Sequence, residues 1–205
     1  MTEASPLTLN RLSIYLRCLQ DLSRRGVERI SSTDMADLYQ LSASQIRKDL
    51  AQFGEFGIRG VGYEVEPLAY QLRSILGLDQ AYGMVIVGIG ALGTALARYP
   101  GFRQGDFQVV GLVDRDPRKV GGRLGRLVIH PPEELPRLVR ETGARIGVLT
   151  VPSSAAQGAL DAVVAAGIRA VLNFAPAQVR ASPGVRIKAV DPRIDLEELA
   201  YFLQR

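Results

Sequence analysis

A glycine-rich turn that directly follows a short apolar run constrains the fold more than any other feature of this sequence. The run Met84–Val87 predicts a buried strand, and the turn Gly88-Ile89-Gly90-Ala91-Leu92-Gly93 leads from it into a helix near 91–99. Strand, G-x-G-x-x-G turn and helix in this order are typical of the first unit of a doubly wound α/β sheet. Further strands are predicted at 107–113, 146–151 and 170–172, separated by helices near 133–142 and 155–166. We therefore expect a Rossmann-like parallel sheet.

The same turn predicts a dinucleotide site. Gly88 permits the tight turn, Gly90 lets the backbone approach a pyrophosphate, and Gly93 allows close packing of helix and strand. The pyrophosphate would lie on the free amides of Ile89, Ala91 and Leu92 at the positive end of the helix dipole. A glycine-rich turn without a ligand is the alternative.

An acidic residue follows about 20 positions beyond the turn, where ribose is bound in such sheets. The carboxylate of Asp114 would accept hydrogen bonds from a ribose 2′-hydroxyl and repel a 2′-phosphate, which favours NADH and NAD+ over the phosphorylated pair. Arg115 comes next and could hold a 2′-phosphate, so that alternative stays open. The basic residues up to Arg126 either line the adenosine side or form a solvated loop.

Two later strand ends are predicted to border the nicotinamide. Thr150, Val151 and Pro152 end one strand, and Asn173, Phe174 and Ala175 end the next. Ligands of open α/β sheets bind at this carboxyl edge. Ordinary strand-to-helix turns explain the same residues equally well.

The first part of the chain predicts a winged helix-turn-helix. Leucines at helical spacing from Leu9 to Leu22 indicate one amphipathic helix, and a second runs from Ser31 or Ser32 to about Tyr39. Ser42 and Gln45 form a capping-box pattern that starts a third helix, 43–53. The glycine-rich segment 54–63 predicts a hairpin, and a connecting helix follows at 65–77.

In a helix-turn-helix, the start of the third helix meets base edges in the major groove. We expect Ser44, Gln45 and Arg47 to read bases there, and Lys48 to hold phosphate. At the hairpin tip, Arg59 is placed to enter a minor groove. Arg11 and Arg17 on the first helix are candidates for phosphate contacts. A helical subdomain with merely solvated arginines is the alternative.

Net charge does not support DNA binding by itself. The chain carries +4, but residues 1–77 hold nine basic and nine acidic residues, so the surplus lies in the later part. The case for DNA therefore depends on where individual charges lie.

Composition argues against several other classes of protein. One cysteine and one histidine make a disulfide framework, a zinc site or a Cys–His catalytic pair improbable. No apolar run reaches the roughly 18 residues of a membrane helix, and the first residues lack the pattern of a signal peptide. We expect a cytoplasmic protein without bound metal.

Two rival functions remain. A small NAD-dependent dehydrogenase would need a general acid, but His130, the only histidine, lies in a predicted turn, and few residues remain for a substrate domain. A CoA- or nucleotide-binding module would bind no DNA and would not discriminate NADH from NAD+. We expect a protein that is not an enzyme.

The assembled motifs resemble the Rex family of redox-sensing transcriptional repressors over nearly the whole chain. The combination of Arg-Lys-Asp-Leu, Arg-Gly-Val-Gly-Tyr and Asn-Phe-Ala-Pro is far more specific than a Rossmann signature alone. The matching stretches are 11–19, 44–50, 53–63, 88–93, 99–102, 114–117 and 173–176.

The resemblance implies a homodimer that binds a palindromic operator and releases it when NADH closes the dimer. It implies a winged-helix domain at 1–77, an NAD(H)-binding domain at 78–190 and a dimerisation helix at 191–205. Tyr99 and Asp191 match a tyrosine and an aspartate that pair between subunits in the family. Pro192 stands where the family usually has another apolar residue, and Gln52 where it often has an aromatic one, so the closing detail near Pro192 can differ.

Overall fold

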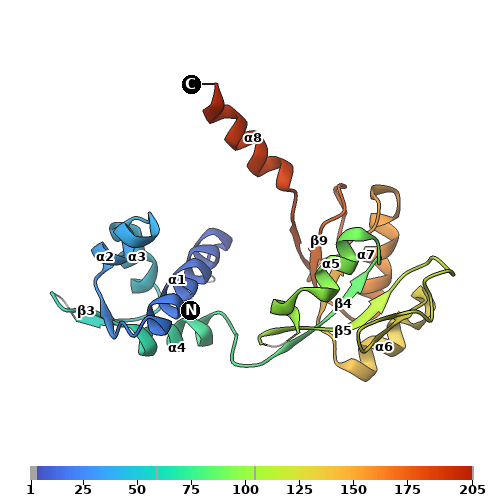
Figure 1. Cartoon of the computed structure of the whole chain (residues 1–205), viewed down its shortest axis with the longest axis horizontal. Coiled ribbons are helices and arrows are strands. Elements are labelled where there is room, and N and C mark those ends of the chain that lie inside the picture. The colour runs from blue at the N-terminus through green and yellow to red at the C-terminus, as the bar shows by residue number, and fades with distance from the viewer. Residues whose placement is uncertain (1–3, 59, 104, 205) are drawn as a thin grey trace. The chain divides into compact units, whose positions relative to one another are not determined.

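The computed structural model describes residues 4–58, 60–103 and 105–204, which divide into two compact units. The first unit comprises residues 1–80 and the second 81–205 (Figure 1). Each unit has its own hydrophobic core. The two are described separately below.

The first unit has the winged helix-turn-helix architecture. Its three strands form an antiparallel sheet in the order β1-β3-β2, and β2 and β3 make the predicted hairpin. Its elements are α1 (Pro6–Arg24), β1 (Arg29–Ile30), α2 (Ser32–Tyr39), α3 (Ala43–Ala51), β2 (Gly57–Ile58), β3 (Gly62–Glu64) and α4 (Val65–Ile75).

Serine caps set the starts of the two short helices. The Ser31 hydroxyl accepts a hydrogen bond from the Asp34 amide at 3.0 Å, and the Ser42 hydroxyl accepts one from the Gln45 amide at 3.3 Å. The helix α3 ends at Ala51, two residues earlier than expected, since the amides of Gln52 and Phe53 bond to carbonyls three residues back, and Gly54 then takes a positive φ of 148°.

The second unit is built on a seven-stranded sheet in the order β10-β9-β8-β4-β5-β7-β6, parallel except for the β6–β7 pair. The six parallel strands follow the Rossmann order 3-2-1-4-5-6, with β4 as strand 1. The strands are β4 (Tyr82–Val87), β5 (Phe107–Val113), β6 (Arg123–Leu124), β7 (Leu127–His130), β8 (Ile146–Leu149), β9 (Ala170–Asn173) and β10 (Arg186–Ala189).

Helices cover both faces of this sheet (Figure 1). The covering helices are α5 (Ala91–Arg98), α6 (Leu135–Thr142) and α7 (Ala156–Ala165), with 3₁₀ turns at Pro100–Phe102, Pro132–Glu134 and Ser153–Ala155, whereas the last helix, α8 (Pro192–Leu203), leads away from the sheet (Figure 1). Alternate residues of β4 enter different cores: Met84 and Ile86 pack on the α5 side, whereas Val85 and Val87 pack against α6 and α7. The doubly wound fold predicted from the sequence is confirmed.

Two features of the second unit were not predicted. Neither the hairpin β6–β7 nor the edge strand β10 was expected from the pattern of residues. The hairpin occupies part of the segment that was expected to be a basic loop, and His130 ends β7 instead of lying in a turn.

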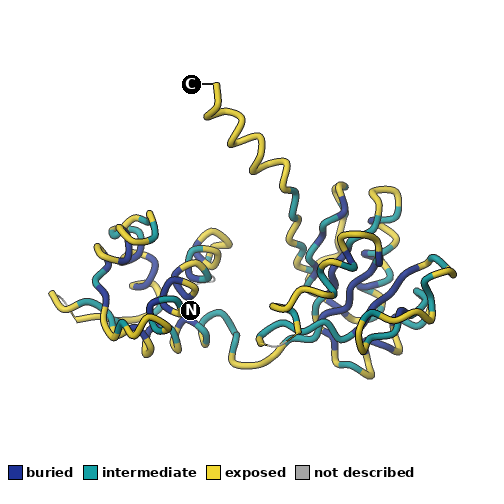
Figure 2. Tube along the Cα trace, in the orientation of Figure 1, coloured by how far each residue is buried: buried dark blue, intermediate teal, exposed yellow. Residues whose placement is uncertain are grey.

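The last helix, α8, has no buried residue, and every one of its residues is solvent-exposed in the single chain (Figure 2). Its exposed apolar side chains are Ile194, Leu196, Leu199, Tyr201, Phe202 and Leu203. Across the described ranges, no helix is both long and apolar enough to span a membrane.

Candidate functional site

A cleft of about 870 Å³ opens at the carboxyl ends of β4, β5 and β8. This is the point where the strand order reverses, the usual ligand site of an open α/β sheet. Among the residues predicted to bind the cofactor, the lining includes Gly88, Gly90, Asp114, Arg115, Thr150, Val151 and Pro152. Three separate strand ends therefore converge on one cleft, as the sequence predicted.

Each glycine of the turn is needed for a different structural reason. A Cβ on Gly93 would lie 2.0 Å from the Gly88 carbonyl oxygen, and Gly88 itself has a positive φ of 100°. A Cβ on Gly90 would meet nothing within 4 Å. Gly88 and Gly93 are thus required by packing within the protein, whereas Gly90 keeps open space on the cleft side of the backbone.

Thr150 ties the turn to the neighbouring strand. Its hydroxyl oxygen lies 2.6 Å from the Gly88 carbonyl oxygen, to which it donates, and 3.2 Å from the Val87 carbonyl oxygen. The turn and the end of β8 are therefore held together before any ligand binds.

Asp114 is buried at the rim of the cleft and is already hydrogen-bonded. It accepts from the amides of Ile89 at 2.7 Å and Asp116 at 2.8 Å, and from the Lys119 ammonium at 3.1 Å. Burial opposes ionisation, but the amide bonds from Asp116 and Ile89 together with Lys119 lower the pKa of Asp114 below its ordinary value. An ionised carboxylate stands where a ribose hydroxyl would bind.

We expect Asp114→Ala to weaken NADH binding about tenfold and to narrow the preference for NADH over NADPH. The variant loses an acceptor for ribose, while Arg115 and Lys119 remain beside the same cleft and attract a 2′-phosphate. Titration calorimetry with each nucleotide measures both effects. If the ratio of the affinities for NADH and NADPH is the same in the variant as in the unmodified chain, the specificity assigned to Asp114 is wrong.

Other predicted cofactor residues do not line the cleft. Ile89 is buried, and Ala91, Leu92 and Gly93 form the first turn of α5. Asn173 is 1% exposed, and its amide bonds to the backbone of Ala175 and Ala177. Together with Phe174 and Ala175, Asn173 thus shapes the turn after β9 in this chain.

The sequence reasoning missed one wall of the cleft. This wall comes from α7 and the turn before it and consists of small side chains: Ser154, Ala155, Gly158, Ala159 and Ala162. Their spacing places them on one helix face, and this run of small residues was a signal that could have been used.

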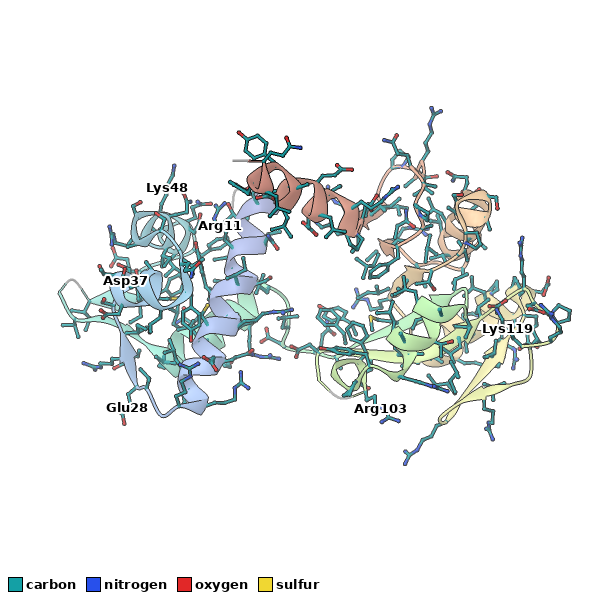
Figure 3. All side chains as sticks on the ribbon, turned by 45° about the horizontal axis from the view of Figure 1, so that its top comes forward. Arg11, Glu28, Asp37, Lys48, Arg103 and Lys119 are labelled. Atoms are coloured by element: carbon teal, nitrogen blue, oxygen red, sulfur yellow. The ribbon has the colours of Figure 1, made fainter. Side chains whose placement is uncertain are left out.

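The predicted base-reading residues lie on α3 with different surroundings. Ser44 is exposed, and so is Lys48, which points away from the body of its unit (Figure 3). Arg47 donates from Nη1 to the Ser32 hydroxyl at 2.7 Å. Gln45 is half-buried and donates from Nε2 to a carboxylate oxygen of Asp49 at 2.8 Å.

Arg11, a candidate for a phosphate contact, is also bonded within its own unit. Its Nε and Nη2 donate to the two carboxylate oxygens of Asp49 at 2.5 and 2.7 Å. Asp49 is 0% exposed and also accepts from the Tyr15 hydroxyl at 2.9 Å. This pairing uses two of the guanidinium nitrogens and joins α1 to α3, while 31% of the Arg11 side chain stays exposed.

The remaining predicted contacts are placed as follows. Arg17 is exposed on α1. Arg59 lies outside the described residues. A hollow of about 780 Å³ lies between the end of α3 and the hairpin, and Arg47 lines it with Tyr63.

Of the two residues matched to an inter-subunit switch, Tyr99 is exposed and Asp191 is paired with a neighbour in the same chain. Tyr99 is 55% exposed, with its ring edge-on to Phe102 at 5.1 Å. Asp191 caps α8 by accepting from the Arg193 amide at 3.1 Å, and it forms an ion pair with the Arg193 guanidinium at 2.5 Å. This pair lowers the pKa of Asp191 to about 2. Within the described residues, no cluster of side chains suits a metal ion.

Comparison with known proteins gives the same division into two parts. The profile of the family described as putative DNA-binding protein N-terminus matches residues 4–51, and that of the CoA binding domain matches residues 79–177.

Curated relatives match the whole chain. The redox-sensing transcriptional repressor Rex of Roseiflexus sp. (strain RS-1) is 41% identical over 205 residues, which are 100% of this chain and 93% of that protein. The protein of the same name from Desulforamulus reducens is 45% identical over 196 residues, covering 96% of this chain and 93% of that protein.

Solved structures of a related repressor match the whole chain as well. RSP in complex with β-NAD+ and operator DNA has a TM-score of 0.92 and 36% identity, covering 99% of this chain and 94% of that chain. RSP in complex with β-NADH has a TM-score of 0.89 and 34% identity, covering 99% of this chain and 95% of that chain. With relatives above 40% identity over at least 96% of its length, a winged helix and a Rossmann cleft, this chain belongs to the Rex family of redox-sensing transcriptional repressors.

Proposed function

We propose that this chain acts as a homodimer that binds palindromic operator DNA and releases it when NADH occupies the Rossmann cleft. The observation that carries the proposal is the convergence of the glycine turn, Asp114 and Thr150 on one cleft, in a chain that also carries a winged helix. The related RSP has been solved with β-NAD+ and operator DNA and with β-NADH, and this supports the same pair of ligands here.

DNA binding is assigned to the exposed side of α3 and its surroundings. Ser44, Gln45, Arg47 and Lys48 would face the major groove, and Arg17 would meet the phosphate backbone. The domain limits 1–77, 78–190 and 191–205 are part of the proposal, which places the protein in the cytoplasm.

Dimerisation is assigned to α8. A 12-residue helix without tertiary contacts is marginal in water, and this one exposes six large apolar side chains in the single chain. A second copy of the chain would bury them. The two winged helices of such a dimer would then face half-sites separated by a whole number of helical turns.

Discrimination of NADH from NAD+ follows from the charge of the nicotinamide. The oxidised ring is positively charged and the reduced ring is neutral, so an apolar surrounding favours NADH because burying an unpaired charge is costly. NADH shifts the dimer only by its difference in affinity between the DNA-binding and released states.

Fluorescence anisotropy of the full chain on labelled palindromic DNA tests the proposal. NADH, NAD+, NADPH and CoA are titrated separately at fixed salt, because phosphate contacts make affinity salt-dependent. We expect release by NADH at much lower concentration than by the other three. Binding of DNA that ignores NADH, or binding of CoA in preference to NADH, would overturn the proposal.

Arg193 supplies a further prediction about release. If Asp191 must pair with Tyr99 of the second copy when NADH is bound, the local ion pair with Arg193 competes with that contact. We expect Arg193→Ala to lower the NADH concentration for half-release about two- to fivefold, the range of an exposed ion pair. The same anisotropy titration measures this shift, with Lys188→Ala on β10 as the control. A higher NADH requirement would contradict the competition.

A further inference from the structure

One buried carboxylate joins a predicted base reader to the core of the winged-helix unit. Asp49 lies on α3, one helical turn after Gln45, and accepts four hydrogen bonds: two from Arg11, one from Tyr15 and one from Gln45. Hydrogen bonding by Arg11 lowers the pKa of Asp49, so the group is a carboxylate at neutral pH.

A carboxylate has no proton to donate, and this settles the orientation of the Gln45 amide. The amide has a nitrogen that donates and an oxygen that accepts, and only the nitrogen can bond to Asp49. With Nε2 held at 2.8 Å from Asp49, the carbonyl Oε1 forms the other side of the amide. No hydrogen bond among the described residues reaches Oε1, so its accepting capacity is available to a ligand.

We infer that Asp49 is a positioning residue for DNA recognition: it fixes the Gln45 amide so that Oε1 accepts from a base carrying an exocyclic amino group. The inference rests on the proposed DNA-binding function and adds a specificity to it. In the major groove the amino donors are N6 of adenine and N4 of cytosine, whereas guanine and thymine present only acceptors at their own edges. The amide of an unbonded glutamine could rotate by 180° and present either its nitrogen or its oxygen to a base, but the bond to Asp49 fixes the orientation of the Gln45 amide.

The inference changes what is expected of Gln45. Adenine is the best partner, because the second N–H of Nε2 can also reach its N7 while Oε1 accepts from N6. Cytosine is second, because it offers the amino donor alone. Asp49 acts only through Gln45 and touches no base itself.

The test deletes one exocyclic amino group from the operator. First, each base pair of the operator is substituted in turn, and the affinities of the unmodified chain and of Gln45→Ala are compared. The position read by Gln45 is the one where the substitution weakens binding of the unmodified chain but not of Gln45→Ala. Then the amino group is deleted at that position, with purine in place of adenine or 2-pyrimidinone in place of cytosine. The full chain is titrated onto each duplex at fixed salt. We expect the deletion to cost the unmodified chain about tenfold in affinity and to cost Gln45→Ala nothing.

Asp49→Asn tests the relay itself. An asparagine can donate as well as accept, so the Gln45 amide becomes free to turn, and the cost of the amino deletion should fall to about twofold or less. Tyr15→Phe is the matched control, since it removes another bond to Asp49 but keeps the carboxylate, and it should retain the tenfold cost. Melting curves verify that each variant is folded.

The outcomes are distinct. If the amino deletion costs the unmodified chain nothing, or if Asp49→Asn keeps the full tenfold cost, the inference fails while the repressor function stands. If Tyr15→Phe loses the discrimination as well, the effect reflects loosening of the unit and the relay is overturned. If the unmodified chain binds no palindromic DNA, the proposed function itself fails. The deletion series on the unmodified chain is decisive even if Asp49→Asn does not fold.

Discussion

Replacing Gly90 by alanine is expected to lower NADH affinity about a hundredfold, or about 3 kcal/mol of binding free energy, without destabilising the protein. The new Cβ would meet no protein atom within 4 Å, so the folded state can accommodate it. It would occupy the space through which a pyrophosphate approaches the backbone of the turn. Operator binding without nucleotide should be unchanged, so the variant should repress but not respond to NADH.

Gly93→Ala is the informative comparison for Gly90→Ala. A Cβ at Gly93 would lie 2.0 Å from the Gly88 carbonyl oxygen, so the contact between α5 and β4 must open. This variant should lose both NADH binding and thermal stability. Calorimetric NADH titration beside a melting curve separates the two effects. NADH binding by Gly90→Ala at the affinity of the unmodified chain would show that the pyrophosphate does not lie on this turn.

The parts of the fold that were predictable are those with a local signal. The strand Met84–Val87, its glycine turn and the helix after it are adjacent in sequence, and each has a pattern that depends on its own residues. The serine caps of α2 and α3 are equally local. The cleft followed from the sheet order, because parallel strands bring their carboxyl ends to one edge.

The parts that were missed lack such a signal. The strand β6 has two residues, and β10, at the sheet edge, alternates Arg186 and Lys188 with apolar residues, so neither shows the continuous apolar run of a buried strand. The hairpin and the edge strand are fixed by pairing with neighbours already in place.

The DNA-reading helix shows the same limit at single residues. Ser42 and Gln45 predicted a reciprocal capping box, but the Gln45 side chain turns to Asp49, and only the Ser42 half forms. Arg11 pairs with a residue 38 positions away, which no local pattern specifies. Two residues that were expected to be independent DNA ligands, Arg11 and Gln45, are therefore bonded to the same buried carboxylate, Asp49.

The hydrogen bonds around Asp49 lead to the second prediction with a large expected effect, a loss of stability. Asp49→Ala is expected to destabilise the first unit by about 3 kcal/mol, because it removes bonds to a charged acceptor and leaves the buried Tyr15 hydroxyl without its partner. Amide hydrogen exchange followed by mass spectrometry measures the loss separately in α1 and α3, with β4 of the second unit as an internal reference that should not change. Tyr15→Phe, which deletes one hydroxyl, should cost about 1 kcal/mol.

The effect of Asp49 has a defined pH dependence. Its pKa is lowered in the folded state from the ordinary value of 3.8, so its contribution to stability is present at neutral pH and is lost as the pH falls below about 4. The difference in unfolding free energy between the unmodified chain and Asp49→Ala should therefore shrink in acid. A difference that stays constant down to pH 3 would mean that the carboxylate charge does not stabilise the fold.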